Sequence, residues 1–251
     1  MQALILCGGR GTRAWPHTEQ LPKPMLPIGG RPILHHVMEI YARQGVRDFV
    51  LAAGYLQGVI ATYAEQLPAD WKVDVVDTGD ESGTGERVQR CLDRMDRQFF
   101  ATYGDGVGDI DLAALHRRHL DHGGGATVTV VPLPSQYGTL VVDAADRVDL
   151  FTEKPILTDH LINAGFFVFD SELLGSCPGD SLERDMLPAL GRLGELFVYR
   201  HHGFWRSMDT HKDVVELDRL ASQKEAPWLT TLDSPANESS SPAPRGSSDR
   251  T

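Results

Sequence analysis

Cysteine, lysine and long apolar runs are all scarce in this sequence of 251 residues. The three cysteines, Cys7, Cys91 and Cys177, are odd in number and far apart, which is typical of neither a disulfide framework nor a zinc site. No stretch reaches the roughly 18 consecutive apolar residues of a membrane span. The N-terminal apolar run is too short for a signal peptide and lacks a basic leader. We therefore expect a protein of the reducing cytoplasm with no membrane partner.

Positive charge is also in deficit. Lysine and arginine number 24 against 35 aspartates and glutamates, so the formal net charge is −11. A general nucleic-acid binder would need a basic face, so we expect small-molecule substrates and no nucleic acid. An anionic substrate would then need a local basic pocket. With 41% hydrophobic residues, the chain has the composition of a globular protein and is long enough to bury one substantial core.

Short apolar runs alternate with amphipathic stretches through the first half of the chain. Strands are predicted at 3–7, 48–53, 72–76, 99–103 and 126–131, and helices at 32–43, 57–66, 87–95 and 112–120. This alternation predicts right-handed βαβ units, and hence an α/β core built on a parallel sheet. The second half predicts a β-rich insertion, which makes the sheet mixed, with strands at 138–142, 147–151 and 161–169 and then helices at 182–193 and 212–222.

The C-terminal segment differs in composition from the rest of the chain. From residue 230 to residue 251 the sequence is rich in serine and proline and has no apolar periodicity. Such a segment cannot bury enough apolar surface to order itself. We predict one domain over residues 1–229 and a disordered tail over residues 230–251, which the chemistry does not need.

A glycine-rich loop, Gly8-Gly9-Arg10-Gly11-Thr12-Arg13, follows the first predicted strand. In an open parallel sheet, ligands bind beyond the carboxyl ends of the strands. Glycines there let backbone N–H groups approach phosphate oxygens, and Arg13 adds a forked donor, although a connecting glycine turn would have the same composition. A dinucleotide fingerprint fails because prolines soon after the loop prevent a helix from opening directly. A P-loop fails because no Gly-Lys-Ser or Gly-Lys-Thr closes the loop.

Two charged residues, Lys23 and Asp105, lie in segments that suggest a functional role. Pro22 and Pro24 place Lys23 on a stiff, non-helical segment, which suits a fixed cation that faces phosphates. Gly104 and Asp105 follow the strand predicted at 99–103, at the edge where a sheet binds its ligands. A carboxylate there suits Mg²⁺, which binds through a few carboxylates and substrate phosphates. The structural alternative for Asp105 is a turn-forming Asp-Gly pair.

Taken in order, these motifs resemble the sugar-phosphate nucleotidylyltransferases. Segments 71–79, 84–87, 102–109 and 204–210 further resemble the glucose-1-phosphate cytidylyltransferase branch, and the likeness covers nearly the whole chain except the tail. The resemblance implies a single Rossmann-like α/β domain, with a mixed sheet and flanking helices. It also implies a Mg²⁺-dependent enzyme in which a sugar 1-phosphate oxygen attacks the α-phosphorus of a nucleoside triphosphate and pyrophosphate leaves. The rate enhancement would come mainly from positioning the two substrates and from stabilising the charge on the phosphates. CTP and glucose 1-phosphate are the substrates to expect, and a homo-oligomer is the expected assembly.

The resemblance also assigns roles to individual residues. It implies that Arg13, Lys23 and Asp105 are catalytic and that Asp105 and Asp209 hold the metal. The residues implied to contact the nucleotide are Gly8, Gly9, Gly11, Thr12, Arg13, Thr78, Gly79, Gly85, Arg87 and Gly104. Those implied to contact the sugar phosphate are Glu153, Lys154, Asn163, Gly165 and Trp205. Asp209 has a structural alternative as the N-cap of the helix that follows it.

Several alternatives stay open. Glu86 stands where the family's pattern has a second glycine, and the segment between Tyr55 and Asp77 is much shorter than in the glucose enzymes. GTP, UTP or dTTP, with another sugar or cyclitol phosphate, would keep the same reaction. A glycosyltransferase of the GT-A type would use Asp109 and Asp111, although we favour Asp111 as a helix cap. A non-catalytic nucleotide-sugar binding module is the third alternative, and the intact set of charged residues argues against it.

Three histidines, His116, His119 and His122, are spaced three residues apart and could suggest a metal site. Arg117 and Arg118 lie between them, and no carboxylate or cysteine partner is evident. We therefore interpret the histidines as part of a solvated helix face.

Overall fold

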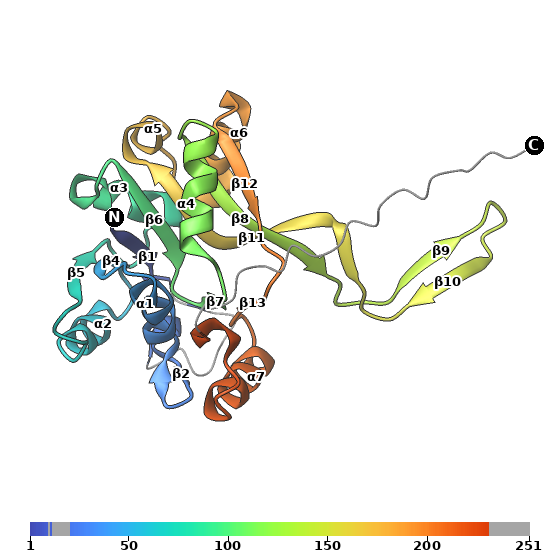
Figure 1. Cartoon of the computed structure of the whole chain (residues 1–251), viewed down its shortest axis with the longest axis horizontal. Coiled ribbons are helices and arrows are strands. Elements are labelled where there is room, and N and C mark those ends of the chain that lie inside the picture. The colour runs from blue at the N-terminus through green and yellow to red at the C-terminus, as the bar shows by residue number, and fades with distance from the viewer. Residues whose placement is uncertain (10, 12–20, 231–251) are drawn as a thin grey trace, which may run out of the picture.

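A computed structural model gives the fold of residues 1–9, 11 and 21–230, around a central seven-stranded sheet of order β12-β8-β11-β6-β1-β4-β5 (Figure 1). These strands are β1 (Ala3–Leu6), β4 (Asp48–Ala53), β5 (Lys72–Asp77), β6 (Gln98–Tyr103), β8 (Ala126–Pro134), β11 (Ile156–Asp170) and β12 (Leu196–Arg200). Neighbours are parallel from β6 to β5, whereas β11 runs antiparallel to both β6 and β8. The predicted mixed α/β sheet is therefore confirmed.

The helices cover both faces of this sheet. They are α1 (Ile33–Arg43), α2 (Gln57–Ala64), α3 (Thr84–Cys91), α4 (Leu112–Asp121), α5 (Ser171–Gly175), α6 (Leu187–Leu193) and α7 (His211–Ser222). Side chains alternate along β1, so Ala3 and Ile5 enter one apolar core while Leu4 and Leu6 enter another. The first core lies under α1, α4 and α7, and the second under α3 and α6. Burial on both faces explains why β1 is apolar throughout.

Two predicted helices differ in their bounds from the structure. The helix predicted at 87–95 begins three residues earlier, at Thr84, because the Glu86 carboxylate accepts the Gly83 N–H at 3.0 Å and closes the first turn. The helix predicted at 182–193 is divided into a π-helical turn, Leu182–Met186, and α6. Pro188 lies in the first turn of α6, where its missing N–H is tolerated.

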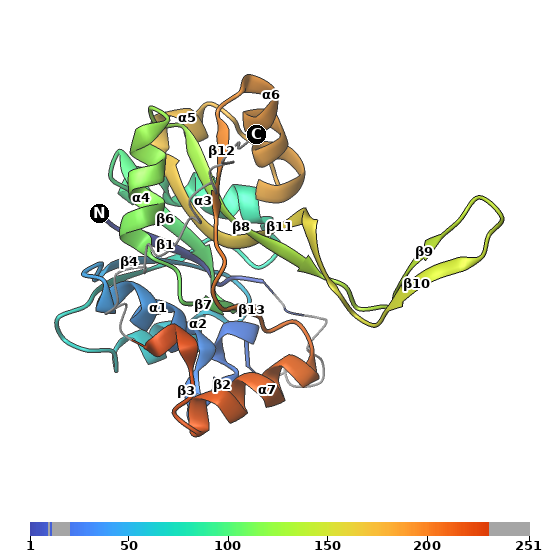
Figure 2. The same ribbon diagram turned by 45° about the vertical axis from the view of Figure 1, so that its right-hand side comes forward.

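Smaller strands complete the fold and place the functional edge. β7 (Gly106–Gly108) pairs with β13 (Trp205–Ser207), and β2 (Pro27–Ile28) pairs with β3 (Arg31–Pro32). β9 (Thr139–Val142) and β10 (Val148–Thr152) form a two-stranded ribbon that projects from the body in both views (Figures 1 and 2). Within residues 1–9, 11 and 21–230, no helix is long and apolar enough to cross a bilayer.

The histidines of α4 face the sheet, so the interpretation of a solvated face is wrong. His119 is fully buried, and its Nδ1 lies 3.0 Å from Thr127 Oγ1. His122 Nε2 lies 2.7 Å from the same oxygen. Leu112 and Leu115 precede the histidines on the apolar stripe of the helix, with His116 and His119 one turn further on the same face. Burial, with smaller contributions from His122 and His116, lowers the pKa of His119 to about 4.

We expect stability to fall as the pH drops below the ordinary histidine pKa. Unfolded His119 binds a proton below that ordinary value of 6.5, whereas the folded residue stays neutral down to about 4. The stabilisation is complete above 6.5 and is lost between these two values, at about 1.4 kcal/mol per pH unit. Urea unfolding at neutral pH and at about pH 5 measures this loss. His119→Gln should lose less stability over the same interval, and an equal loss in both proteins would contradict the assignment.

Candidate active site

Three charged side chains from distant parts of the chain meet at the carboxyl edge of the sheet. Lys23 Nζ donates to Asp105 Oδ2 at 2.5 Å and to Asp209 Oδ1 at 3.0 Å. Lys23 begins the 3-10 turn Lys23–Met25, Asp105 lies just after β6, and Asp209 lies just before α7. The structure therefore brings together Lys23 and both carboxylates that the resemblance implies as metal ligands.

The short β7–β13 pair holds the two carboxylates in place. Asp105 precedes β7 and Asp209 follows β13, and the Met208 N–H donates to the Asp105 carbonyl at 2.8 Å. Ser207 Oγ donates to Asp209 Oδ2 at 2.7 Å. Thr210, not Asp209, is the N-cap of α7, so the structural alternative for Asp209 is wrong.

The electrostatics of this cluster favour a bound cation and phosphates. Burial lowers the pKa of the Lys23 ammonium, but the carboxylates of Asp105 and Asp209 outweigh it and raise the pKa above its ordinary value. Lys23 is therefore charged, and it reduces the repulsion between two carboxylates that would otherwise face each other. Mg²⁺ is commonly bound by one or two carboxylates and takes its remaining ligands from water and phosphates. The donor set of Asp105 and Asp209 therefore fits this ion.

A cavity of about 380 Å³ opens beside the cluster at the carboxyl ends of β1 and β6. Its wall includes the predicted loop residues Gly8, Gly9 and Gly11, together with Gly104. Gly11 has φ +62°, and a Cβ there would lie 2.6 Å from the Lys23 Cβ, so only glycine lets the loop lie against this lysine. Thr12 and Arg13 lie outside the described residues.

The N-terminal turn of α3 forms the opposite wall of this cavity, at Ser82, Gly83 and Thr84. The first N–H groups of a helix lack partners within it. In α3 the Glu86 carboxylate accepts the Gly83 N–H and the Asp180 carbonyl accepts the N–H groups of Gly85 and Glu86, so the turn lines the cavity without offering it these donors. Gly85 does not line the cavity. Its N–H donates to the Asp180 carbonyl at 3.0 Å, and a Cβ on Gly85 would collide with the Gly179 carbonyl. Gly85 therefore lets α3 pack closely on the segment before the π-helical turn.

Arg87 lies beneath the glycine loop and is 3% exposed. Its guanidinium donates to Thr78 Oγ1 at 2.5 Å, to the Gly79 carbonyl at 2.9 Å and to the Gly8 carbonyl at 3.0 Å. Further bonds reach the Ala53 and Asp80 carbonyls. Arg87 therefore ties the ends of β1, β4 and β5 together, and it holds the backbone of Gly8, which lines the cavity, against Thr78 and Gly79, which do not line it.

A second group of predicted residues gathers around Tyr103 at the end of β6. Asn163 Nδ2 donates to Tyr103 Oη at 3.3 Å, and Gly165 packs directly against the tyrosine ring. Trp205 Nε1 donates to the Ala164 carbonyl at 2.7 Å and so fixes the segment between Asn163 and Gly165. Asn163, Gly165 and Trp205 are thus assembled next to the cavity, which Tyr103 lines.

Two residues that no motif indicated also belong here: Tyr103 lines the cavity, and Glu183 bonds to the lining residues Tyr103 and Thr84. Tyr103 Oη donates to Glu183, and Thr84 Oγ1 and Ser181 Oγ donate to the same carboxylate at 2.6 and 3.0 Å. Tyr103 could have been found, because it is the last residue of a strand that ends at the ligand edge. Glu183 lies in the π-helical turn Leu182–Met186, and no motif or periodicity in the sequence indicates a functional role for it.

Glu153 and Lys154 directly follow β10. The β9–β10 ribbon projects away from the body of the molecule (Figure 1). Lys154 has a left-handed φ of 48°, and its Nζ lies 3.5 Å from Glu153 Oε1. Across the described part of the chain, neither residue forms a hydrogen bond or ion pair with Lys23, Asp105 or Asp209. The structure does not bring these two predicted residues to the cluster.

The Asp-x-Asp motif has structural partners of its own. Asp111 Oδ1 accepts the Ala114 N–H at 2.8 Å, which confirms its predicted role as the cap of α4. Asp109 Oδ1 lies 2.9 Å from His201 Nε2. Two carboxylates with separate protein partners do not form a metal pair, so this motif does not support a glycosyltransferase. Over the described ranges, no group of three or more histidine, cysteine or carboxylate side chains could hold a metal ion.

Comparisons with known proteins agree with this geometry. The family described as Nucleotidyl transferase matches residues 2–219. The chain is 39% identical to the glucose-1-phosphate cytidylyltransferase of Salmonella typhi over 92% of this chain and 99% of that protein. It is 33% identical to the mannose-1-phosphate guanyltransferase of Aspergillus oryzae, over 86% of this chain and 62% of that protein. HddC from Yersinia pseudotuberculosis has a similar structure, with a TM-score of 0.70 and 25% identity over 87% of this chain and 98% of HddC.

Proposed function

This chain belongs to the nucleotidyl transferase family, and from that premise we propose that it condenses CTP with glucose 1-phosphate to form CDP-glucose and pyrophosphate. One observation carries the proposal: a buried lysine lies between two carboxylates at the mouth of a glycine-lined cavity. The identity of 39% with the Salmonella typhi cytidylyltransferase supports the choice of base and sugar.

The residues around the cavity suit the two halves of the nucleotide. The backbone of Gly8, Gly9, Gly11 and Gly104 would receive the triphosphate, next to the first turn of α3. The backbone of Thr78 and Gly79 would hold the base and ribose, kept in place by Arg87. Gly85 would act indirectly, by letting α3 pack closely on the segment that contains Asp180. Thr12 and Arg13 keep the roles that the resemblance implies.

In this reaction the protein mainly positions the substrates and stabilises the charge on the phosphates. An oxygen of the sugar phosphate attacks the α-phosphorus of CTP, the bond to the β-phosphate breaks, and pyrophosphate leaves with the bonding electron pair. The charged Lys23 faces the phosphates and stabilises the negative charge that develops on them. Asp105 and Asp209 would hold Mg²⁺, which when bound neutralises phosphate charge. Asn163, Gly165 and Trp205, which lie next to the cavity, would contact the sugar phosphate. Glu153 and Lys154 keep the sugar-phosphate roles that the resemblance implies.

Two further expectations stay proposals. We place the enzyme in the cytoplasm, and the finding that Cys7, Cys91 and Cys177 are buried and free supports a reducing compartment. Residues after Thr230 take no part in the proposed chemistry.

A competition experiment tests the choice of substrates. The purified protein is given Mg²⁺, equal amounts of CTP, UTP, GTP, ATP and dTTP, and either glucose 1-phosphate or mannose 1-phosphate. We expect CDP-glucose as the main product by mass spectrometry. A different nucleotide sugar would keep the reaction and contradict the choice of substrates.

Replacing Lys23 should affect the nucleotide more than the sugar phosphate. Lys23→Ala removes the cation that faces the phosphates, so we expect about a 10²-fold fall in kcat/KM for CTP. The KM for glucose 1-phosphate should change far less. Steady-state kinetics with each substrate varied in turn make this comparison, and the reverse pattern would show that Lys23 binds the sugar phosphate.

A further inference from the structure

Glu86 stands where the family's pattern has glycine, and its carboxylate lies beside a wall of the nucleotide cavity. Its Oε2 accepts the N–H of Gly83, a residue of that wall, at 3.0 Å. Its Oε1 takes part in no hydrogen bond within the described part of the chain, and the side chain is 39% exposed. The cap of α3 therefore fixes one carboxylate oxygen and leaves the other open to a ligand.

Arg90, one turn further along α3, lies against the segment that would hold the base and ribose. Its Nη1 donates to the Thr78 carbonyl at 2.6 Å. A Cβ on Gly79 would lie 3.0 Å from the same nitrogen, so the guanidinium packs directly over the Gly79 backbone. Its Nη2 lies 3.9 Å from Glu86 Oε1, beyond hydrogen-bond distance. Arg90 and Glu86 therefore place one donor and one open acceptor next to this segment.

The backbone donors of the first turn of α3 are largely taken by other groups. The Gly83 N–H is held by Glu86. The N–H groups of Gly85 and Glu86 point to the Asp180 carbonyl, at 3.0 and 3.4 Å. Selection of a base at this wall therefore depends on side chains, among them the open oxygen of Glu86.

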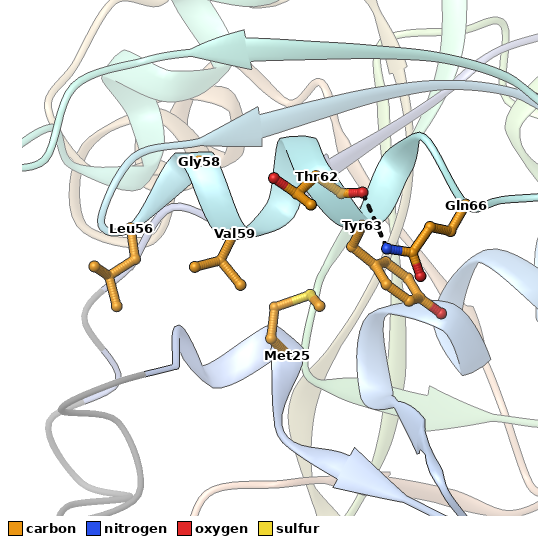
Figure 3. A pocket seen from close by; sticks show the side chains of 7 residues that line it. All are labelled: Met25, Leu56, Gly58, Val59, Thr62, Tyr63 and Gln66. Carbon is orange, nitrogen blue, oxygen red and sulfur yellow. Dashed lines mark hydrogen bonds between the residues drawn. The ribbon is translucent and has the colours of Figure 1, made fainter.

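A second hollow flanks the turn that carries the catalytic lysine, but it offers no charged group to a base. It has a volume of about 600 Å³ and lies between α2 and the turn Lys23–Met25 (Figure 3). Its described lining residues are uncharged and include the aliphatic side chains of Leu56 and Val59. The Gln66 amide donates to the Thr62 carbonyl at 3.5 Å (Figure 3). The polar edge of a base therefore matches the α3 side better than this hollow.

The pyrimidine bases differ at a group that a carboxylate can distinguish. Cytosine carries an N4 amino group, which donates, where thymine and uracil carry the O4 oxygen, which accepts. An ionised carboxylate only accepts hydrogen bonds, so it binds the amino group and repels the carbonyl oxygen. An open carboxylate oxygen beside the base therefore favours cytosine.

We propose that Glu86 determines the choice among pyrimidine nucleotides. Its Oε1 accepts a hydrogen bond from the N4 amino group of CTP, while Oε2 stays on the Gly83 N–H. UTP and dTTP, which carry O4 at this position, bind more weakly. This inference rests on the proposed function, because that function places the base at Thr78 and Gly79, the segment that Arg90 and Glu86 border.

Glu86→Gln tests the proposal without removing the cap, because glutamine supports the same capping box. When its oxygen accepts the Gly83 N–H, its NH₂ group takes the place of Oε1, so a donor replaces the acceptor. Isothermal titration calorimetry with Mg²⁺ and without sugar phosphate gives the dissociation constants of CTP and UTP. The wild type should bind CTP at least about 10-fold more tightly than UTP, and in the variant this preference should disappear or reverse.

The ratio of the two dissociation constants isolates the contact with the base. Loss of a negative charge near the phosphates strengthens the binding of both nucleotides alike and leaves their ratio unchanged. Asp93→Asn is the matched control, because it removes a carboxylate that is 75% exposed in the turn Leu92–Arg94 just after α3. This control should keep the wild-type ratio, and urea unfolding should give the same stability for Glu86→Gln and the wild type.

The outcomes separate this inference from the proposed reaction. A wild type that binds UTP as tightly as CTP, or a Glu86→Gln variant that keeps the wild-type ratio, would overturn the role of Glu86. A protein that shows the expected ratios but forms no nucleotide sugar would refute the proposed reaction and support the role of Glu86. Binding of neither nucleotide would refute both.

Discussion

Asp105→Asn should lower turnover by about 100-fold or more without unfolding the protein, a loss comparable to removing one electrostatic stabiliser. The change keeps the shape of the side chain and removes the charge that faces Lys23 at 2.5 Å. It also removes one of the two carboxylates that would hold Mg²⁺. We therefore expect the variant to need more Mg²⁺ for half-maximal rate, and Asp209→Asn to behave in the same way.

Pyrophosphate release is measured at saturating substrate over a range of Mg²⁺ concentrations. This experiment gives the turnover number and the Mg²⁺ concentration for half-maximal rate. Asp109→Asn is the matched control, because Asp109 lies on the same segment but pairs with His201 outside the cluster. It should keep a rate close to that of the wild type. A folded Asp105→Asn variant with nearly normal turnover would refute the metal assignment, and a selective loss of pyrophosphate release in Asp109→Asn would show instead that Asp109 takes part in the reaction.

Arg87→Met should have the largest effect on stability, with the free energy of unfolding lowered by about 3 kcal/mol or more. Arg87 is nearly fully buried and joins the ends of three strands through bonds to backbone carbonyls and Thr78. Methionine fills a similar volume but leaves these groups without their donor. Lysine would also be a poor replacement, because one ammonium cannot reproduce the fork of the guanidinium.

Urea denaturation, together with the KM for CTP, tests this role. Arg94→Met is the control, since Arg94 lies in the turn Leu92–Arg94 just after the same helix, its side chain is 41% exposed and bonds Asp74 and Asp93, and exposed charges contribute about 1 kcal/mol or less. We expect Arg87→Met to lose stability and CTP affinity together, because Gly8 and Gly79 lose their support. A variant with normal stability and a raised KM for CTP would show instead that Arg87 binds the nucleotide directly.

Much of the fold could be predicted from the sequence because local patterns agree with the tertiary structure. The apolar runs that became β1 and β4, and the helical spacing of α1, needed no information from distant residues. The position of Asp105 followed from the rule that parallel sheets bind ligands at their carboxyl ends. The proximity of Asp209 could not be predicted from local pattern, because it depends on the pairing of β7 with β13, two short strands far apart in sequence.

The misinterpretations have identifiable physical causes. His119 was assigned to solvent because of its arginine neighbours, although its spacing from Leu112 and Leu115 places it on the apolar stripe. The start of α3 lies earlier than the predicted residue 87 because the Glu86 carboxylate caps the helix, a contact that the apolar periodicity does not reveal. The apolar residues of β9 and β10 predict strands, but the local pattern does not show that the ribbon they form projects from the body of the molecule.

The fate of each phosphate of CTP tests the central claim most directly. CTP labelled at the α-phosphate, and separately at the γ-phosphate, is incubated with the wild-type protein, Mg²⁺ and glucose 1-phosphate. The proposed reaction predicts that the α-label enters the nucleotide sugar and the γ-label enters pyrophosphate, and that neither transfer occurs without glucose 1-phosphate. Release of γ-label as inorganic phosphate, or an α-label that never joins a sugar, would contradict the assignment of this chain as a sugar-1-phosphate cytidylyltransferase.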